Sequence, residues 1–456
     1  MTGFHGGLAD VWVVKLDSGG QLEWQRALGG TQNDFSAAVI QTSDMGFVVA
    51  GGTSSSNGDV TSNHGMSDAW VIKLNASGAL VWQQTYGGSN VDSAQDIIQT
   101  ADGGYAVVGT TRSNDGDVSG HQGFGDIWML RLDPVGVLLW QRTLGSANGE
   151  YGNALTASND GGVVVVGTTT GNGGDVMGHH GEFDMWVVKL DSTGQLQWQL
   201  PLGGSMFEEA FAITSTQDGG FAVAGYTDSN DGDVTGGQGG KDYWVVKLEG
   251  GGTLQWQRTL GGSGLDIGYA IEERNGGDLL VSGITTSTDG DISLAYGGYD
   301  AWLVRLSASG ALVWEQSYGG SANDSFSGIE LVDGGYCLVG GTFSNDGMVT
   351  GHHGGGDVWV VKLVTDMTAV PERAGLEMQF ELFPNPTEGE VTIRFGTPQA
   401  EVHIEAFDGT GKLVVGKHFT GLGIMPSIDL SGLPRGLYAL RIITPDGAAT
   451  RTVVRH

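Results

Sequence analysis

Tryptophan recurs in this chain at a fixed interval, and that interval limits the possible folds more than any other feature. The first series of tryptophans has a spacing of 58 residues, with a last step of 57, and comprises Trp12, Trp70, Trp128, Trp186, Trp244, Trp302 and Trp359. The second series follows the first by twelve residues and comprises Trp24, Trp82, Trp140, Trp198, Trp256 and Trp314. A long repeat of this kind indicates one supersecondary unit copied along the chain.

Each repeat contains four short runs typical of β-strands, separated by turns rich in glycine, asparagine and aspartate. In one copy these runs are 36–40, 47–51, 69–74 and 80–84. The first is small and apolar, the next two are almost continuously apolar, and the fourth begins to alternate. Because continuous apolar runs are typical of strands buried on both faces, we expect the first strand at a crowded centre and the fourth at an outer rim.

Four antiparallel strands ordered from centre to rim describe one blade of a β-propeller. A β-solenoid is the main alternative, but its coils need only ~20–30 residues per turn. The chain holds six copies of the inner two strands, seven of the tryptophan strand and six of the outer strand. We therefore expect an all-β fold with a propeller of six four-stranded blades over residues 1–363, in which the outer strand 22–26 completes the last blade.

The first residues of the chain closely match residues 348–363, so Met1 falls inside a repeat. The sequence contains no signal peptide, and we expect the natural precursor to be longer, with room for a seventh blade. No apolar stretch reaches the ~18 residues of a membrane span. The formal net charge of −31 excludes nucleic acid and anionic membranes as expected partners. Cys337 is the single cysteine, so no intramolecular disulfide is possible.

Four acidic positions recur in the repeat, and every copy of the tryptophan strand carries one lysine or arginine, which is a candidate partner for one of these acids. We expect most of these acids to be structural, because aspartate at a turn or before a strand accepts backbone N–H bonds. The alternative is that calcium binds in the loops that follow the second strand, and no other cofactor is expected. The residues proposed for these calcium loops are Asp59, Asp115, Asp117, Asp231, Asp233, Asp289 and Asp291.

No catalytic residue is assigned from the sequence. Enzymes on propellers usually depart from the repeat near the central axis, and the departures here include Glu209, Glu272 and Lys241. Acidic pairs such as these serve acid–base chemistry in glycoside hydrolases. We expect copy-to-copy drift on a solvated surface to explain them.

The repeat, with its D-x-W-V-V-K-L-D, W-Q and D-G-G elements, resembles tandem-repeat propellers of secreted proteins from Bacteroidota. At Val364 the repeat stops. Residues 364–377 are expected to form a linker, and 378–456 a small Ig-like β-sandwich.

This last segment resembles the C-terminal sorting domain of the type IX secretion system. The residues that carry the resemblance are Pro384, Asn385, Pro386, Gly411, Gly436, Tyr438 and Arg455. The resemblance implies export across the outer membrane, and the secretion machinery and its sortase as partners. It also implies release from the cell or attachment to its outer surface.

These observations favour a secreted or cell-surface, non-enzymatic binding or scaffold propeller, with glycans or proteins as candidate ligands. The alternative is a secreted polysaccharide hydrolase or lyase that acts at the propeller mouth.

Overall fold

A computed structural model describes residues 3–332, 335–364, 380–395, 401–408, 413–420, 425–444 and 447–456. The chain divides into two compact units, Met1–Thr365 and Asp366–His456. Every regular element within the described ranges is a β-strand. The predicted linker 364–377 lies outside the described residues except for Val364, which ends a strand.

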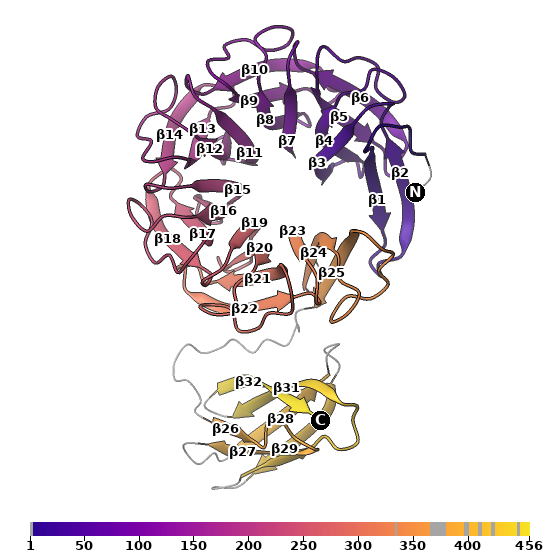
Figure 1. Cartoon of the computed structure of the whole chain (residues 1–456), viewed down its shortest axis with the longest axis vertical. Helices are drawn as coiled ribbons and strands as arrows, with labels where there is room; N and C mark the ends of the chain where they lie inside the picture. The colour runs from indigo at the N-terminus through magenta and orange to yellow at the C-terminus, as the bar shows by residue number, and fades with distance from the viewer. Residues whose placement is uncertain are drawn as a thin grey trace. The chain divides into compact units, whose positions relative to one another are not determined.

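The first unit is a β-propeller with five complete blades, each an antiparallel sheet of four strands (Figure 1). The first blade contains β3 (Asp34–Gln41), β4 (Phe47–Thr53), β5 (Asp68–Leu74) and β6 (Leu80–Tyr86). The second contains β7 (Asp92–Gln99), β8 (Tyr105–Thr111), β9 (Asp126–Leu132) and β10 (Leu138–Leu144). The third contains β11 (Glu150–Ala157), β12 (Val163–Thr169), β13 (Asp184–Leu190) and β14 (Leu196–Leu202). The fourth contains β15 (Glu208–Ser215), β16 (Phe221–Thr227), β17 (Asp242–Leu248) and β18 (Leu254–Leu260). The fifth contains β19 (Asp266–Glu273), β20 (Leu279–Thr285), β21 (Asp300–Leu306) and β22 (Leu312–Tyr318).

The strands of each blade run outward in chain order, as the apolar gradient of the repeat predicts. The strands β3, β7, β11, β15 and β19 surround the centre, and β10, β14, β18 and β22 lie at the rim (Figure 1). The third strand of a complete blade is almost wholly buried, and β5, β13 and β17 are buried at every residue. The outer strand β6 has both exposed and buried residues, as expected of a half-exposed strand at the rim.

The two tryptophan series hold a blade together and join it to the next. Trp70 lies on β5 and is 1% exposed, and its Nε1 donates to Oε1 of Gln83 on β6, at 2.7 Å. The same bond recurs at Trp128, Trp186, Trp244 and Trp302, with a glutamate as acceptor in the last case. In the second series, Trp82 packs over Gly136 of the following blade, where a Cβ would lie 2.9 Å from the ring. Both tryptophans of the repeat, and the glutamine that follows the second one, therefore have structural roles.

The two ends of the ring differ from the expected closure. The last blade has three strands, β23 (Asp324–Val332), β24 (Gly335–Thr342) and β25 (Asp357–Val364), and β1 (Val11–Leu16) pairs only with β2 (Leu22–Leu28). No described ladder joins β2 to β25, so 22–26 does not complete the last blade. A tight turn links β1 to β2, with Gly20 N donating to Asp17 O at 3.0 Å, and such a short loop costs little closure entropy.

The second unit contains two antiparallel sheets that share one apolar core. One sheet contains β26 (Phe380–Phe383), β27 (Glu390–Phe395) and β30 (Ser427–Asp429). The other contains β28 (Glu401–Phe407), β29 (Leu413–Thr420), β31 (Gly436–Thr444) and β32 (Gly447–Arg455). Val391 and Ile393 of the first sheet pack with Ile404, Leu440 and Ile442 of the second. Two sheets with a common core form a sandwich, as predicted.

Candidate functional site

The junction between one blade and the next, which we call a seam, is built around a glycine that follows the outer strand. At the seam of Gly87, Asp92 opens the inner strand of the next blade and is fully buried. Its carboxylate accepts bonds from Ser113 Oγ at 2.7 Å and Gly88 N at 2.8 Å, and from the hydroxyl of Thr111. A buried carboxylate is tolerated when donors surround it in this way.

The predicted calcium-loop residues lie at these seams and bind the main chain. Asp117 Oδ2 accepts from Gly87 N at 3.2 Å, and Asp115 Oδ1 accepts from Ser89 N at 2.7 Å. The backbone N–H of Asp117 in turn donates to Gly87 O at 2.9 Å. The same arrangement recurs at Asp231 with Asp233 and at Asp289 with Asp291, and Asp59 plays the part of Asp117 beside Gly29. Each loop therefore fastens its own blade to the preceding one.

A third acid opens each tryptophan strand and is less completely bonded. In Asp68, Oδ2 accepts from the backbone N–H of His64 at 2.8 Å, but no donor reaches Oδ1 within the described residues. The pKa of Asp126 and that of Asp242 are raised to about 6, chiefly by burial and further by the neighbouring carboxylate Glu150 or Asp266. These carboxyls therefore take up protons at mildly acidic pH.

Calcium binding at the seams stays a prediction. Within the described ranges, no three or more His, Cys, Asp or Glu side chains are grouped so that they could hold a metal ion. The loop aspartates that were proposed as ligands are spread over several seams. At each seam their oxygens already accept backbone hydrogen bonds.

The recurring cations bind the acid of the turn between the two inner strands. Lys73 Nζ lies 2.7 Å from Asp44 Oδ1, and Lys247 Nζ lies 2.8 Å from Asp218 Oδ2. At these two positions the lysine of the tryptophan strand therefore pairs with the recurring acid of the inner turn. The pairs anchor the inner hairpin of a blade to its tryptophan strand.

The residues nearest the axis change from blade to blade. Each inner strand has a bulge at its fourth residue, where the register breaks, for example between Ala94 and Asp96. Bulges re-aim side chains and are frequent beside functional sites. The bulged residues are Ala37, Gln95, Asn153, Phe211, Tyr269 and Ser327. No common requirement of the blade fixes this position.

Two of these bulged residues belong to a group that we call the axial cluster: Glu209, Phe211, Tyr226, Lys241 and Tyr269. The ring centroids of Phe211 and Tyr269 are 5.3 Å apart, and those of Phe211 and Tyr226 are 6.0 Å apart. The Tyr226 hydroxyl donates to Glu209 Oε1 at 2.8 Å, and Lys241 Nζ lies 3.7 Å from the Tyr226 ring centroid. The cluster thus joins the buried ring of Tyr226 and the half-buried rings of Phe211 and Tyr269 to a carboxylate and an ammonium group.

Sequence reasoning singled out Glu209 and Lys241 but missed the three aromatic residues. The signal was present in the repeat. Where the fourth blade has Tyr226, the neighbouring blades have Thr168 and Ile284, and where it has Phe211 the third has Asn153. Comparing each repeat position across the blades would have found these residues.

A second acidic group lies on the inner strands β19 and β23. Burial, and then the nearby charge of Glu330, raise the pKa of Glu272 to about 7, and burial also raises the pKa of Glu330. The adjacent Glu273 instead accepts a bond from the backbone N–H of Gln217, at 2.8 Å, and so links two blades. A carboxyl group whose pKa lies near neutrality suits proton transfer at neutral pH, and Glu272 has this property.

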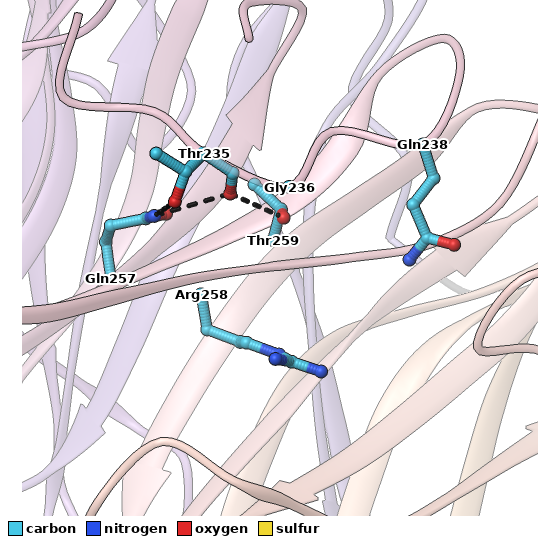
Figure 2. A pocket seen from close by; sticks show the side chains of 6 residues that line it. All are labelled: Thr235, Gly236, Gln238, Gln257, Arg258 and Thr259. Atoms are coloured by element: carbon cyan, nitrogen blue, oxygen red, sulfur yellow. Dashed lines mark hydrogen bonds between the residues drawn. The ribbon is translucent and has the colours of Figure 1, made fainter. Parts of the chain in front are cut away.

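A small pocket of about 210 Å³ lies on the fourth blade and is lined by polar residues (Figure 2). Gln257 and Thr259 both donate to the Thr235 carbonyl, at 3.3 and 3.0 Å. Gln238, also on the pocket wall, donates to Asp291 Oδ2 of the next blade at 2.7 Å. These polar groups are therefore engaged in structural bonds, apart from the exposed Arg258.

In the second unit, the structure brings several of the sorting residues to the last strand. Asn385, between Pro384 and Pro386, donates to Thr452 O at 2.8 Å and accepts from Val454 N at 2.9 Å. Arg455 on β32 donates to Ser431 O at 2.7 Å, and the buried Tyr438, two residues after Gly436, donates to Pro434 O at 2.7 Å. Gly411 lies outside the described residues.

Comparison of the chain with known proteins gives limited likeness. The regulatory protein FlaEY of Caulobacter vibrioides is 28% identical over 167 residues, which cover 34% of this chain and 17% of FlaEY. The extracellular domain of a hybrid two-component system from B. thetaiotaomicron aligns with a TM-score of 0.41 at 10% identity, over 99% of this chain and 54% of that one. Puromycin hydrolase aligns with a TM-score of 0.38 at 13% identity, over 92% of this chain and 53% of that one.

The described part of the chain contains no helix that is long and apolar enough to cross a membrane.

Over the second unit the comparison is specific. Residues 381–455 match the family described as a secretion system C-terminal sorting domain. The chain therefore ends in a type IX secretion sorting domain, which directs export to the outer surface or the medium.

Proposed function

We propose that this chain is a secreted or surface-displayed propeller that binds its ligand without catalysing a reaction, and that the axial cluster is its binding site. The repeat resembles secreted propellers of Bacteroidota, and the sorting domain supplies the export route. The candidate ligands are glycans and proteins.

The observation that carries this proposal is the contrast between a repeated frame and one group that breaks the repeat. The recurring acids bind the main chain at the seams, so they fix the blades in place. The axial cluster instead presents Phe211 and Tyr269, both half-buried, next to Glu209 and Lys241. Aromatic faces with a few polar groups beside them are typical of binding sites, where the rings supply area and the polar groups orientation.

The test is retention of the full chain on immobilised polysaccharides and on outer-surface proteins. We expect Phe211→Ala and Tyr269→Ala each to weaken binding at least about tenfold, since stacked aromatic residues dominate such sites. Phe124→Ala is the matched control, because Phe124 is 80% exposed and lies outside the cluster. Equal binding by all three variants would remove the axial cluster as the site.

One observation favours a second function, in which the protein cleaves polysaccharide at the propeller mouth as a hydrolase or a lyase. Glu272, with its pKa near neutrality, lies beside a second carboxyl group, Glu330, and such pairs divide the roles of acid and base in glycosidases. The test is release of reducing or unsaturated chain ends from polysaccharides. An enzyme would lose this activity in Glu272→Gln and keep it in Glu273→Gln, and native protein without activity would exclude the second function.

A further inference from the structure

Three groups of apolar residues are exposed at the two ends of the propeller, although the equivalent residues of the other complete blades are buried. On the last blade, Val339, Val358 and Val360 are 41%, 62% and 41% exposed. On β1, Trp12 and Val14 are 40% and 38% exposed, and on β3, Val39 is 57% exposed. We call these six residues the open seam. The Lys362 ammonium of β25 donates to Ser18 O in the turn after β1, at 3.4 Å, so the last blade and β1 are neighbours.

The complete blades show what covers the equivalent residues. In the fourth blade, Ala224, Tyr243 and Val245 correspond to Val339, Val358 and Val360, and each is fully buried. They pack in one cluster with the residues of the next blade's inner strands, Ile271, Leu279 and Val281, and with Trp302, the counterpart of Trp12.

The other face of the same inner pair covers the third group. Leu280 on β20 packs in one cluster with Ile329 on β23. Ile329 is the counterpart of Val39, yet it is 9% exposed where Val39 is 57% exposed. A single two-stranded element therefore accounts for all three groups, because it contacts the blade before it, the tryptophan strand beside it and the inner strand after it.

The charges at the open seam specify the turn of that element. In complete blades the lysine of the tryptophan strand binds the aspartate in the inner turn, as Lys247 binds Asp218 at 2.8 Å. Its counterpart on β1, Lys15, pairs instead with Glu23 of the outer strand β2. A hairpin with aspartate in its turn would give Lys15 the partner that its counterparts have.

From this geometry we propose that the open seam binds a β-hairpin built like the repeat's own inner strand pair. The hairpin adds to the edge of β1 that has no strand partner among the described residues, through main-chain hydrogen bonds, and covers the open seam with alternating apolar side chains. The second strand of this hairpin must carry apolar residues on both faces, as β20 does at Leu279 and Leu280. Its turn must contain an aspartate.

The test adds a synthetic peptide of residues 208–227 to the full chain and follows amide hydrogen exchange by mass spectrometry. This segment spans β15 and β16 and carries Asp218 in its turn. We expect exchange across Val11–Leu16 to slow at least about tenfold, because edge amides become hydrogen-bonded. A fusion that places the same segment ahead of residue 1 through a flexible linker gives the same result if the free peptide does not fold.

The controls separate the proposed docking from general stickiness. A peptide with Ile213→Asp and Val223→Asp lacks the apolar contacts, and a full chain with Val360→Asp lacks one wall of the open seam; both are expected to abolish the protection. Absence of protection with both the peptide and the fusion would overturn the proposal. A dimer of the chain that protects the open seam without peptide would overturn it too, since a second copy would then be the occupant.

Discussion

The seams and the axis of this propeller use the same repeat in opposite ways. At the seams the acids recur, and each accepts bonds from the main chain of a neighbouring blade. At the axis the bulged residue changes from alanine to glutamine, asparagine, phenylalanine, tyrosine and serine around the ring. The difference teaches that repetition marks the residues that fasten neighbouring blades, and that residues specific to this protein lie where the repeat is broken.

The largest difference between seam and axis is expected when a methyl group is added at a seam. In Gly203→Ala the new Cβ would lie 2.5 Å from Glu208 Oε2 and 3.0 Å from Asp184 Oδ1, both buried. We expect the variant to lose about 2–4 kcal/mol of unfolding free energy, because two buried carboxyl groups must move to make room for the methyl group. Urea unfolding measures the loss. In Gly251→Ala the Cβ meets nothing within 4 Å, and this control should change by less than about 0.5 kcal/mol.

The protonation of the seams gives the next largest effect. The folded-state pKa of Asp242, about 6, lies above its ordinary value of 3.8, so the folded protein holds this proton more tightly than the unfolded chain. The stabilisation is complete below about pH 4 and is lost as the pH rises to about 6. We expect the native melting temperature to fall between pH 4 and pH 7, and to fall less in Asp242→Asn, whose amide does not ionise.

Asp102 provides the opposite case, because its pKa is lowered in the folded protein. Hydrogen bonds from Thr100 and then Arg131 lower its pKa to about 2. Its contribution to stability is therefore present above about pH 4 and is lost as the pH falls towards 2. Asp102→Asn should match the native slope between pH 4 and pH 7 and differ only at lower pH, and an altered slope near neutrality would contradict this assignment.

At the axis we expect a smaller and opposite response to substitution. At pH 8 Glu272 is ionised in a partly buried position beside Glu330, so Glu272→Gln should stabilise the protein by about 1 kcal/mol. At pH 5 the native glutamate is protonated and the two proteins should unfold alike. Thermal unfolding at the two pH values decides it, and a loss of stability at pH 8 would show that the carboxylate makes a bond of structural value.

The smallest effect is expected at the rim. Arg258 lies on the exposed wall of the small pocket in Figure 2, and its neighbours Gln257 and Thr259 bond to Thr235 without it. Arg258→Ala should therefore change the unfolding free energy by less than about 0.5 kcal/mol. A larger loss in urea unfolding would mean that the rim also contributes to closing the ring.

Much of the architecture was predictable because it rests on local patterns. The apolar gradient within one repeat predicts the order of strands from centre to rim, and the tryptophan spacing marks the blades. The pairing of β2 with β1 was not predicted, because both partners of an outer strand have the same sequence pattern and only the short connecting turn decides between them.

The candidate site was less predictable for a physical reason. Glu209 and Lys241 were found as charged departures from the repeat, but Tyr226 and Phe211 are apolar enough to pass as ordinary strand residues. Their contacts join β15, β16 and β19 across two blades, and such a meeting of side chains depends on the bulges and on ring closure. Comparison of repeat positions can find the residues that differ, but it does not show that they meet.

The most direct test of the account is thermal unfolding of the full chain with and without millimolar calcium after exhaustive chelation. If Asp115, Asp117 and their counterparts fasten blades through main-chain hydrogen bonds, the melting temperature is the same in both conditions. A calcium-dependent rise would mean that the folded state binds the ion, and the loops that we interpret as fasteners would then be metal sites.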